Sequence, residues 1–244
     1  MGAVIVITSG KGGTGKTTIT GGAAAALSRV GRHVLCIDMD IGLRNLDITL
    51  GLHDRALLDF TDVALGRVPL DRAVVAHPDL PGLYLLTSPM QLPENLRPET
   101  VQAMLRKASE RFDYVLIDSP AGLGSGFRLA CCGADRAIVV STSDASSLRD
   151  AQRTVEELAY LRQIHLVMNR IQPKLLRQLR TTIDDAMDAA GLPLIGVVPE
   201  DQHVILSANQ GKPLLPRTRP GAADACRNIA LRLEGRQVPI MRIR

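Results

Sequence analysis

Residues 10 to 18 read Gly-Lys-Gly-Gly-Thr-Gly-Lys-Thr-Thr, and this segment constrains the chain more than any other. Its spacing fits G-x-x-x-x-G-K-[ST], a loop whose backbone N–H groups surround phosphate oxygens. An apolar run at residues 4–7 precedes the loop, and an alanine-rich stretch at residues 22–30 follows it. A strand, a glycine-rich loop and a helix therefore stand in the order that the motif requires, and the helix dipole favours phosphate at its start.

The loop offers side chains as well as backbone groups. Lys16 is placed to reach the β- and γ-phosphates of a nucleotide, and the Thr17 hydroxyl is a ligand for Mg²⁺. We therefore expect ATP and Mg²⁺ as cofactors. The nucleotide-binding residues expected in the loop are Lys11, Gly12, Gly13, Thr14, Gly15, Lys16, Thr17 and Thr18.

Two further buried strands are expected to end in carboxylates. Residues 33–38 and 112–118 are rich in apolar side chains and finish at Asp38 and Asp118, and Asp40 follows closely. Ligands of α/β sheets lie at the carboxyl ends of strands. We expect Asp38 and Asp118 to serve the metal site and Asp40 to orient or deprotonate the attacking water. The alternative is that these carboxylates only cap turns and helices.

The remaining pattern alternates strands with helices. We expect short strands at residues 72–75 and 83–86, and further buried strands at 136–141, 164–170 and 192–198. Helices are expected at residues 57–65, 99–111, 148–161 and 222–234. Together these elements predict a three-layer α/β P-loop NTPase fold, with a mostly parallel twisted sheet and helices on both faces.

Composition narrows the class of protein. The chain has 244 residues and is 45% hydrophobic but only 2% aromatic, so we expect an aliphatic core. No apolar run approaches the length of a membrane-spanning helix, and the first strand begins without a signal sequence, so we expect a cytoplasmic protein. The formal charge of +4 is too small to indicate nucleic acid, and none is expected as a partner.

A second lysine, Lys11, distinguishes the loop. The run K-G-G-T-G-K-T from residue 11 resembles the loop of the deviant Walker A ATPases, the family of MinD and ParA proteins. In that family the extra lysine reaches the partner subunit's nucleotide. The resemblance therefore implies an ATP-dependent homodimer in which Lys11 neutralises charge on the transferring phosphoryl group. From the residues alone, a local phosphate contact or a solvated side chain is the alternative for Lys11.

Three segments resemble the MinD branch of this family. I-D-M-D-I-G-L-R-N-L-D at 37–47 resembles its switch I, where ParA proteins usually carry D-x-D-P-Q, and D-S-P-A-G at 118–122 resembles switch II. G-V-V-P-E-D-Q at 196–202 resembles the adenine-side loop. The resemblance implies ATP hydrolysis coupled to dimerisation in placement of the division septum. The implied catalytic residues are Lys11, Lys16 and Asp40, and the base and ribose candidates are Asn169, Pro199, Glu200 and Asp201.

The resemblance also implies partners. A MinC-like inhibitor and a MinE-like or other activator would meet the helix expected at 148–161, where Asp150 matches an acidic position but Gln152 replaces a second acid of many relatives. Two alternatives stay open. One is a ParA-like or FlhG-like ATPase that positions chromosomes or flagella. The other is an iron–sulfur carrier similar to nitrogenase iron protein, with a ligand from Cys131 or Cys132.

The end of the chain differs from the family pattern. We expect an ATPase domain at residues 1–234 and a short basic tail at 235–244, whereas MinD relatives usually continue into an amphipathic membrane-binding helix. By resemblance to these relatives, the inner face of the cell membrane is a further candidate partner, although this chain lacks the amphipathic helix. We expect only weak, salt-sensitive vesicle binding through Arg236, Arg242 and Arg244.

Overall fold

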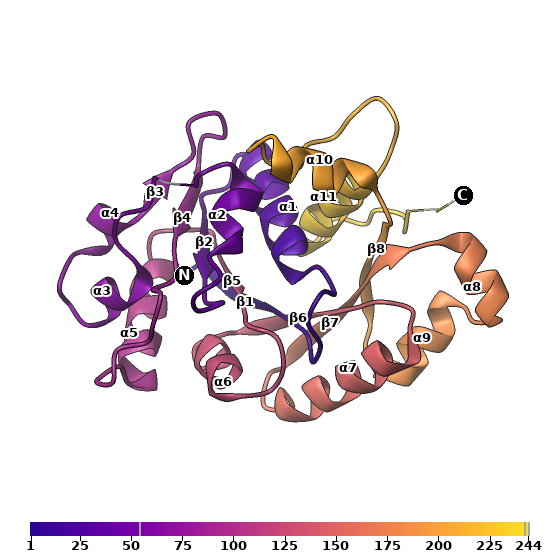
Figure 1. Ribbon diagram of the computed structural model, residues 1–244, viewed down its shortest axis with the longest axis horizontal. Coiled ribbons are helices and arrows are strands. Elements are labelled where there is room, and N and C mark those ends of the chain that lie inside the picture. Colours follow the sequence, from indigo (N-terminus) through magenta and orange to yellow (C-terminus); the bar gives the residue numbers. More distant parts are fainter. Residues whose placement is uncertain (54, 242, 244) are drawn as a thin grey trace.

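An eight-stranded sheet runs through the computed structural model, which describes residues 1–53, 55–241 and 243 (Figure 1). The strand order is β3-β4-β2-β5-β1-β6-β7-β8, and every neighbouring pair is parallel except β3 and β4. The strands are β1 (Ala3–Thr8), β2 (Val34–Asp38), β3 (Val75–Ala76), β4 (Leu83–Leu86), β5 (Tyr114–Asp118), β6 (Arg136–Ser141), β7 (Gln163–Ile171) and β8 (Leu194–Pro199). The predicted α/β fold with a mostly parallel sheet is confirmed.

Helices cover both faces of the sheet (Figure 1). One face carries α1 (Lys16–Arg29), α2 (Asn45–Leu50), α10 (Gln202–Asn209) and α11 (Ala222–Leu233). The opposite face carries α5 (Pro98–Ser109), α6 (Ser125–Cys131), α7 (Ala145–Glu157) and α9 (Ile183–Ala190). The short helices α3 (Phe60–Ala64) and α4 (Leu70–Ala73) lie beside α5, and α8 (Pro173–Leu179) follows β7.

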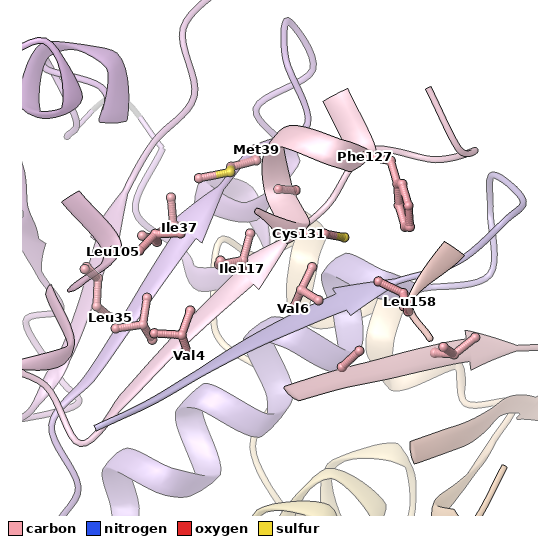
Figure 2. Close-up of a cluster of buried hydrophobic side chains, with 14 of the residues drawn as sticks. Val4, Val6, Leu35, Ile37, Met39, Leu105, Ile117, Phe127, Cys131 and Leu158 are labelled. Carbon is pink, nitrogen blue, oxygen red and sulfur yellow. The ribbon is translucent and has the colours of Figure 1, made fainter. Parts of the chain in front are cut away.

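The core is aliphatic and lies in two layers, one on each side of the sheet. Val4 and Val6 of β1 belong to one buried cluster, and Ile5 and Ile7 belong to the other, because successive strand side chains point to opposite faces. Figure 2 shows the first cluster, in which Ile117 lies among side chains of β1 and β2. Strands that are buried on both faces read as continuous apolar runs, which is why the sequence revealed them.

Two local predictions need correction. The strand expected at residues 72–75 is wrong, because α4 occupies Leu70–Ala73 and β3 contains only Val75–Ala76. Leu70 and Ala73 are both buried, and their spacing of three residues suits one face of a helical turn. The helix expected at 57–65 is shorter, because the Asp59 carboxylate accepts a hydrogen bond from the Thr61 N–H at 2.8 Å and caps the helix there. Helices α2, α6, α8, α9 and α10 were not predicted.

The tail at residues 235–241 is held against the folded domain. The Arg232 guanidinium donates to the carbonyls of Ile195, Val238 and Pro239 at 2.7, 2.9 and 2.8 Å. Arg242 and Arg244, which we expected to meet an anionic surface, lie outside the described residues. The domain boundary at residue 234 therefore stays a prediction. In the part of the chain that the structure describes, no helix is long and apolar enough to cross a membrane.

The first prediction concerns the core. Ile117→Ala removes a fully buried side chain from the central strand β5 and should lower the free energy of unfolding by about 2–5 kcal/mol, because it leaves a cavity. Ile205→Ala, on the exposed side of α10, is the control and should change stability by less than about 0.5 kcal/mol. Urea unfolding without nucleotide measures both, and equal effects would contradict the assigned core.

Candidate nucleotide-binding site

Three neighbouring strands bring the predicted phosphate and metal residues together. The sheet order β2-β5-β1 places Asp38 in register with Asp118, and Asp118 in register with Ile7, just before the glycine-rich loop. The loop connects β1 to α1, which begins at Lys16. The residues predicted to contact phosphate and metal therefore meet at the carboxyl edge of the sheet, as expected for an α/β fold.

The loop conformation depends on glycine. Gly13 and Gly15 have φ angles of 78° and 93°, a left-handed conformation that other residues rarely adopt. A Cβ atom at Gly15 would also collide with the amide of Asn169, whose Nδ2 donates to the Thr14 carbonyl at 2.7 Å. The glycine-rich sequence is thus required both by backbone conformation and by close packing against β7.

Lys16 lies within the site and is only 7% exposed. Its ammonium donates to the Ser9 hydroxyl at 3.1 Å. Burial lowers the pKa of Lys16, and the nearby carboxylates of Asp118 and Asp40 oppose that change by favouring the charged ammonium. A cation at this position is suited to phosphate oxygens.

Three carboxylates gather here, and two of them, Asp118 and Asp40, lie near the Lys16 ammonium. Asp38 and Asp118 are 0% and 1% exposed, and Asp40 is half-buried. Burial raises the pKa of Asp118 to about 7, and repulsion from Asp38 adds to the rise. Burial likewise raises the pKa of Asp38 to about 6 and moves the pKa of Asp40 upward. The ligand-free site therefore favours uptake of protons or of a cation.

The oxygen donors fit Mg²⁺. The Thr17 hydroxyl donates a hydrogen bond to Asp118, so two of the three predicted metal ligands meet at one point. Among the described residues, no three His, Cys, Asp or Glu side chains form a complete metal-ligand set. Mg²⁺ usually takes only one or two carboxylates and completes its coordination with water and substrate phosphates, so a partial protein set is what a Mg²⁺–nucleotide site requires.

Asp38 has a structural task as well. Its two oxygens accept hydrogen bonds from the backbone N–H groups of Asp40, at 2.9 Å, and Leu46, at 3.2 Å. Asp38 thereby fixes the segment that carries Asp40 and leads into α2. The cap role that we kept as an alternative is thus observed for Asp38, while its metal role stays a prediction.

The side chain of Lys11 leaves the loop and reaches the start of α7. Its exposed ammonium forms an ion pair with Asp144 at 3.1 Å and donates to the Ser146 hydroxyl at 2.9 Å. Burial would raise the pKa of Asp144, but hydrogen bonds from Thr142, Ser146, Ser147 and Lys11 hold this pKa well below its usual range. Sequence reasoning missed Asp144, although an Asp before Ala-Ser-Ser is a helix-cap signal for α7.

The base and ribose candidates lie on the β7–β8 side of the loop. The β7–β8 pairing shifts register between Met168 and Ile171, and Arg170 has a positive φ of 56°. At this irregularity, the Asn169 amide donates a hydrogen bond to the glycine-rich loop. Its neighbour Arg170 forms an ion pair with Glu200 at 2.8 Å. A recess of about 370 Å³ is lined by Lys11, Gly12, Gly13, Thr14, Arg170 and Glu200, among others.

Pro199, Glu200 and Asp201 also line a neighbouring cavity of about 310 Å³. The Asp201 oxygens accept hydrogen bonds from the N–H groups of His203 and Ala222, both at 2.9 Å. Asp201 therefore caps α10 and ties it to the start of α11. Its assignment to the ribose stays a prediction, as do the assignments of Pro199 and Glu200.

The second prediction follows from the raised pKa values. In the ligand-free folded protein Asp118 keeps its proton up to about pH 7, whereas an unfolded chain releases it near about pH 4. Between about pH 4 and pH 7, Asp118 therefore holds more protons in the folded state than in the unfolded state. As pH rises through this range, Asp118 lowers the free energy of unfolding. Asp118→Asn should be more stable than the parent at pH 8, and this difference should shrink as pH falls and vanish below about pH 4. Urea unfolding without Mg²⁺ tests this, and a pH-independent difference would contradict it.

Comparison with known proteins agrees with this geometry. The sequence pattern of the CobQ/CobB/MinD/ParA nucleotide binding domain family matches residues 5–214. The septum site-determining protein MinD of Synechocystis sp. is 40% identical over 248 residues, which cover 99% of this chain and 92% of that protein. The MinD cell division protein of Aquifex aeolicus superposes with a TM-score of 0.88 at 36% identity, covering 98% of this chain and 100% of that one.

Two further solved structures contain a MinD protein together with MinC or with Mg-ADP. The MinC:MinD complex of Aquifex aeolicus has a TM-score of 0.88 at 37% identity and covers 98% of each chain. The septum site-determining protein MinD of Pyrococcus horikoshii, complexed with Mg-ADP, has a TM-score of 0.83 at 29% identity and covers 96% of each chain.

These findings decide between the functions left open by the sequence. The predicted ATPase class is confirmed by the family match and by the MinD relatives. Of the two cysteines in the iron–sulfur alternative, Cys131 packs inside the core (Figure 2), and Cys132 is partly buried. The chain belongs to the CobQ/CobB/MinD/ParA nucleotide binding domain family, and within it to the MinD-like, septum site-determining ATPases.

Proposed function

We propose that this ATPase binds ATP with Mg²⁺, forms a homodimer around the nucleotide and hydrolyses it to control the division site. The observation that carries the proposal is the buried set of Lys16, Asp38 and Asp118 beside the exposed Lys11. The first set suits a Mg²⁺–phosphate group, and Lys11, whose ion pair with Asp144 is exposed, can act outside its own subunit once that pair opens. The relative of known structure with Mg-ADP supports the choice of ligand.

Each residue has a defined task in this scheme. Lys16 contributes positive charge to the β- and γ-phosphates, and the backbone N–H groups of residues 12–16 surround their oxygens. Thr17 and Asp118 hold Mg²⁺, which when bound neutralises phosphate charge. The Asp40 carboxylate interacts with the positive charge of Lys16. In this scheme Asp40 positions the attacking water. Asn169 and the 199–201 segment receive the base and ribose.

Lys11 must leave Asp144 before it can contact a partner subunit. Both side chains are about half exposed, at 44% and 49%. An exposed ion pair of this kind contributes roughly 0–1 kcal/mol, so replacing it by a phosphate contact is energetically easy. Because Asp144 is the N-cap of α7, the change would begin at the first turn of that helix.

We further propose that α7 carries this change to regulatory partners. Gly10 allows the loop to approach α7 closely, because a Cβ there would collide with the backbone of Asp150. The outer side of α7 presents Arg149, Gln152, Arg153, Glu156 and Glu157 to solvent. A MinC-like inhibitor is supported by the Aquifex aeolicus complex, and a MinE-like activator is proposed for the same helix.

For localisation we propose the cytoplasm, with contact to the inner face of the membrane as a weak addition. Within the described tail, Ile240 is 40% exposed and Met241 packs against the core. This segment offers little apolar area to insert into a bilayer.

The third prediction tests the role of Lys11. Lys11→Ala should bind ATP yet remain monomeric, because the cation that would reach the partner's phosphates is lost. Sedimentation velocity with ATP, ADP and no nucleotide measures the outcome. Lys174→Ala, an exposed lysine of α8, is the matched control and should dimerise with ATP as the parent does. Asp144→Asn frees the Lys11 ammonium and should also dimerise; an ATP-dependent Lys11→Ala dimer would refute the assignment.

The fourth prediction concerns the chemical step. Asp40→Ala should slow ATP hydrolysis on the order of 100-fold or more while ATP binding persists, because water is no longer positioned. The dimer should then accumulate with ATP. Phosphate release and nucleotide-binding titrations measure the two properties, with the exposed Asp79→Ala as control. Turnover that matches the parent would move the water-positioning role to Asp38.

A further inference from the structure

A cleft of about 850 Å³ opens at the edge of the sheet opposite the nucleotide site. Its floor comes from the first residues of three strands: Arg136 and Ile138 of β6, His165 of β7 and Ile195 of β8. Because these strands are parallel, their first residues lie at the amino edge, whereas the loop and carboxylates lie at the carboxyl edge. The end of α11 forms the other wall, beside β8 (Figure 1).

The cleft carries positive charge that the protein does not neutralise. In the described part of the chain, neither Arg136 nor Arg162 has an ion-pair partner. Arg232 donates to three backbone carbonyls, which are neutral acceptors. Three guanidinium groups therefore line one recess without a carboxylate of their own, and an anion is the ligand that such a set favours.

The acidic residue among the cleft-lining residues is already engaged. Glu234 accepts two hydrogen bonds from Arg32, at 2.9 and 2.5 Å, and one from the Tyr114 hydroxyl at 2.6 Å. This carboxylate is therefore not available to compensate the cleft arginines. Burial and then Arg136 lower the pKa of the half-buried His165 imidazole. In its neutral form an imidazole can donate one N–H to an anion.

Apolar side chains complete the lining. Leu161, Ile164, Leu194 and Leu233 are partly exposed and form a hydrocarbon surface beside the arginines. The other apolar lining residues are the buried Ile5, Ala137, Ile138, Leu192 and Ile195 and the exposed Pro193. The cleft volume lies within the range of small-molecule sites, roughly 300–1,000 Å³. No Phe, Tyr or Trp occurs among these described lining residues, so a stacked nucleobase is not favoured.

We propose that this cleft binds an amphipathic anion, a single hydrocarbon chain that ends in a carboxylate or phosphate. The head group lies on Arg136 and Arg162, and the chain lies over the partly exposed Leu161, Ile164 and Leu194. The ligand enters as a single molecule from solution, because α11 and the tail anchored by Arg232 border the recess. The site is separate from the nucleotide site, since the two lie at opposite edges of the sheet.

Titration calorimetry of the full chain with dodecyl phosphate, kept below its micelle concentration, tests this proposal. We expect saturable binding at one site per chain. Arg162→Gln and Arg136→Gln/Arg162→Gln should weaken it, the double variant by at least about tenfold, which is about 1.4 kcal/mol. The control Arg97→Gln/Arg106→Gln, two exposed arginines at α5 on the other face, should bind as the parent does. Thermal unfolding verifies that each variant is folded.

Ligand arms separate the contributions of charge and chain. Inorganic phosphate and dodecyl maltoside, which lack the chain and the charge respectively, should each bind at least about tenfold more weakly than dodecyl phosphate. The proposal is overturned if the double variant binds dodecyl phosphate as tightly as the parent does. It is also overturned if inorganic phosphate binds as tightly as dodecyl phosphate, or if the protein binds phosphatidylglycerol vesicles but not monomeric dodecyl phosphate.

Discussion

The charges at the carboxyl ends of β1, β2 and β5 impose the strongest constraint on this structure. Asp38 and Asp118 are fully buried near each other, and Lys16 places one ammonium near Asp118. Burial makes ionised carboxylates costly. Without nucleotide, the raised pKa values of Asp38 and Asp118 therefore favour protonated carboxyl groups, which lowers the negative charge of the site. A divalent cation with its phosphate ligands is the alternative solution. The same arrangement that destabilises the empty site therefore provides the affinity for Mg²⁺–nucleotide.

The elements around these charges serve to hold the loop in place. Gly13 and Gly15 give the loop its shape, and Asn169 fixes it to the end of β7. On its outer side the loop touches α7 closely at Gly10, and Lys11 reaches the cap of the same helix at Asp144. A change at the phosphates therefore has a short physical route to a helix surface where a partner can bind.

Much of this could be predicted because the signals are local. The loop, the buried strands and the carboxylates at strand ends each occupy a few consecutive residues. The strand expected at 72–75 failed because Val74 and Val75 suggested β-structure, while burial of Leu70 and Ala73 selected a helical turn. The pairing of Lys11 with Asp144 joins residues 133 apart in sequence. Nor could spacing reveal that Asp201 ties α10 to α11, since that bond depends on where α11 packs.

In this account, Asp118 and Asp38 hold protons in the nucleotide-free protein, and binding of Mg²⁺–ATP displaces them. Calorimetric titration with Mg²⁺–ATP at pH 6.5, in two buffers of different ionisation enthalpy, counts the protons released on binding. We expect net release from the parent, because Asp118 has a pKa raised to about 7 and Asp38 one raised to about 6. Asp118→Asn should release fewer protons. Binding without proton release, or equal release from both proteins, would contradict the account.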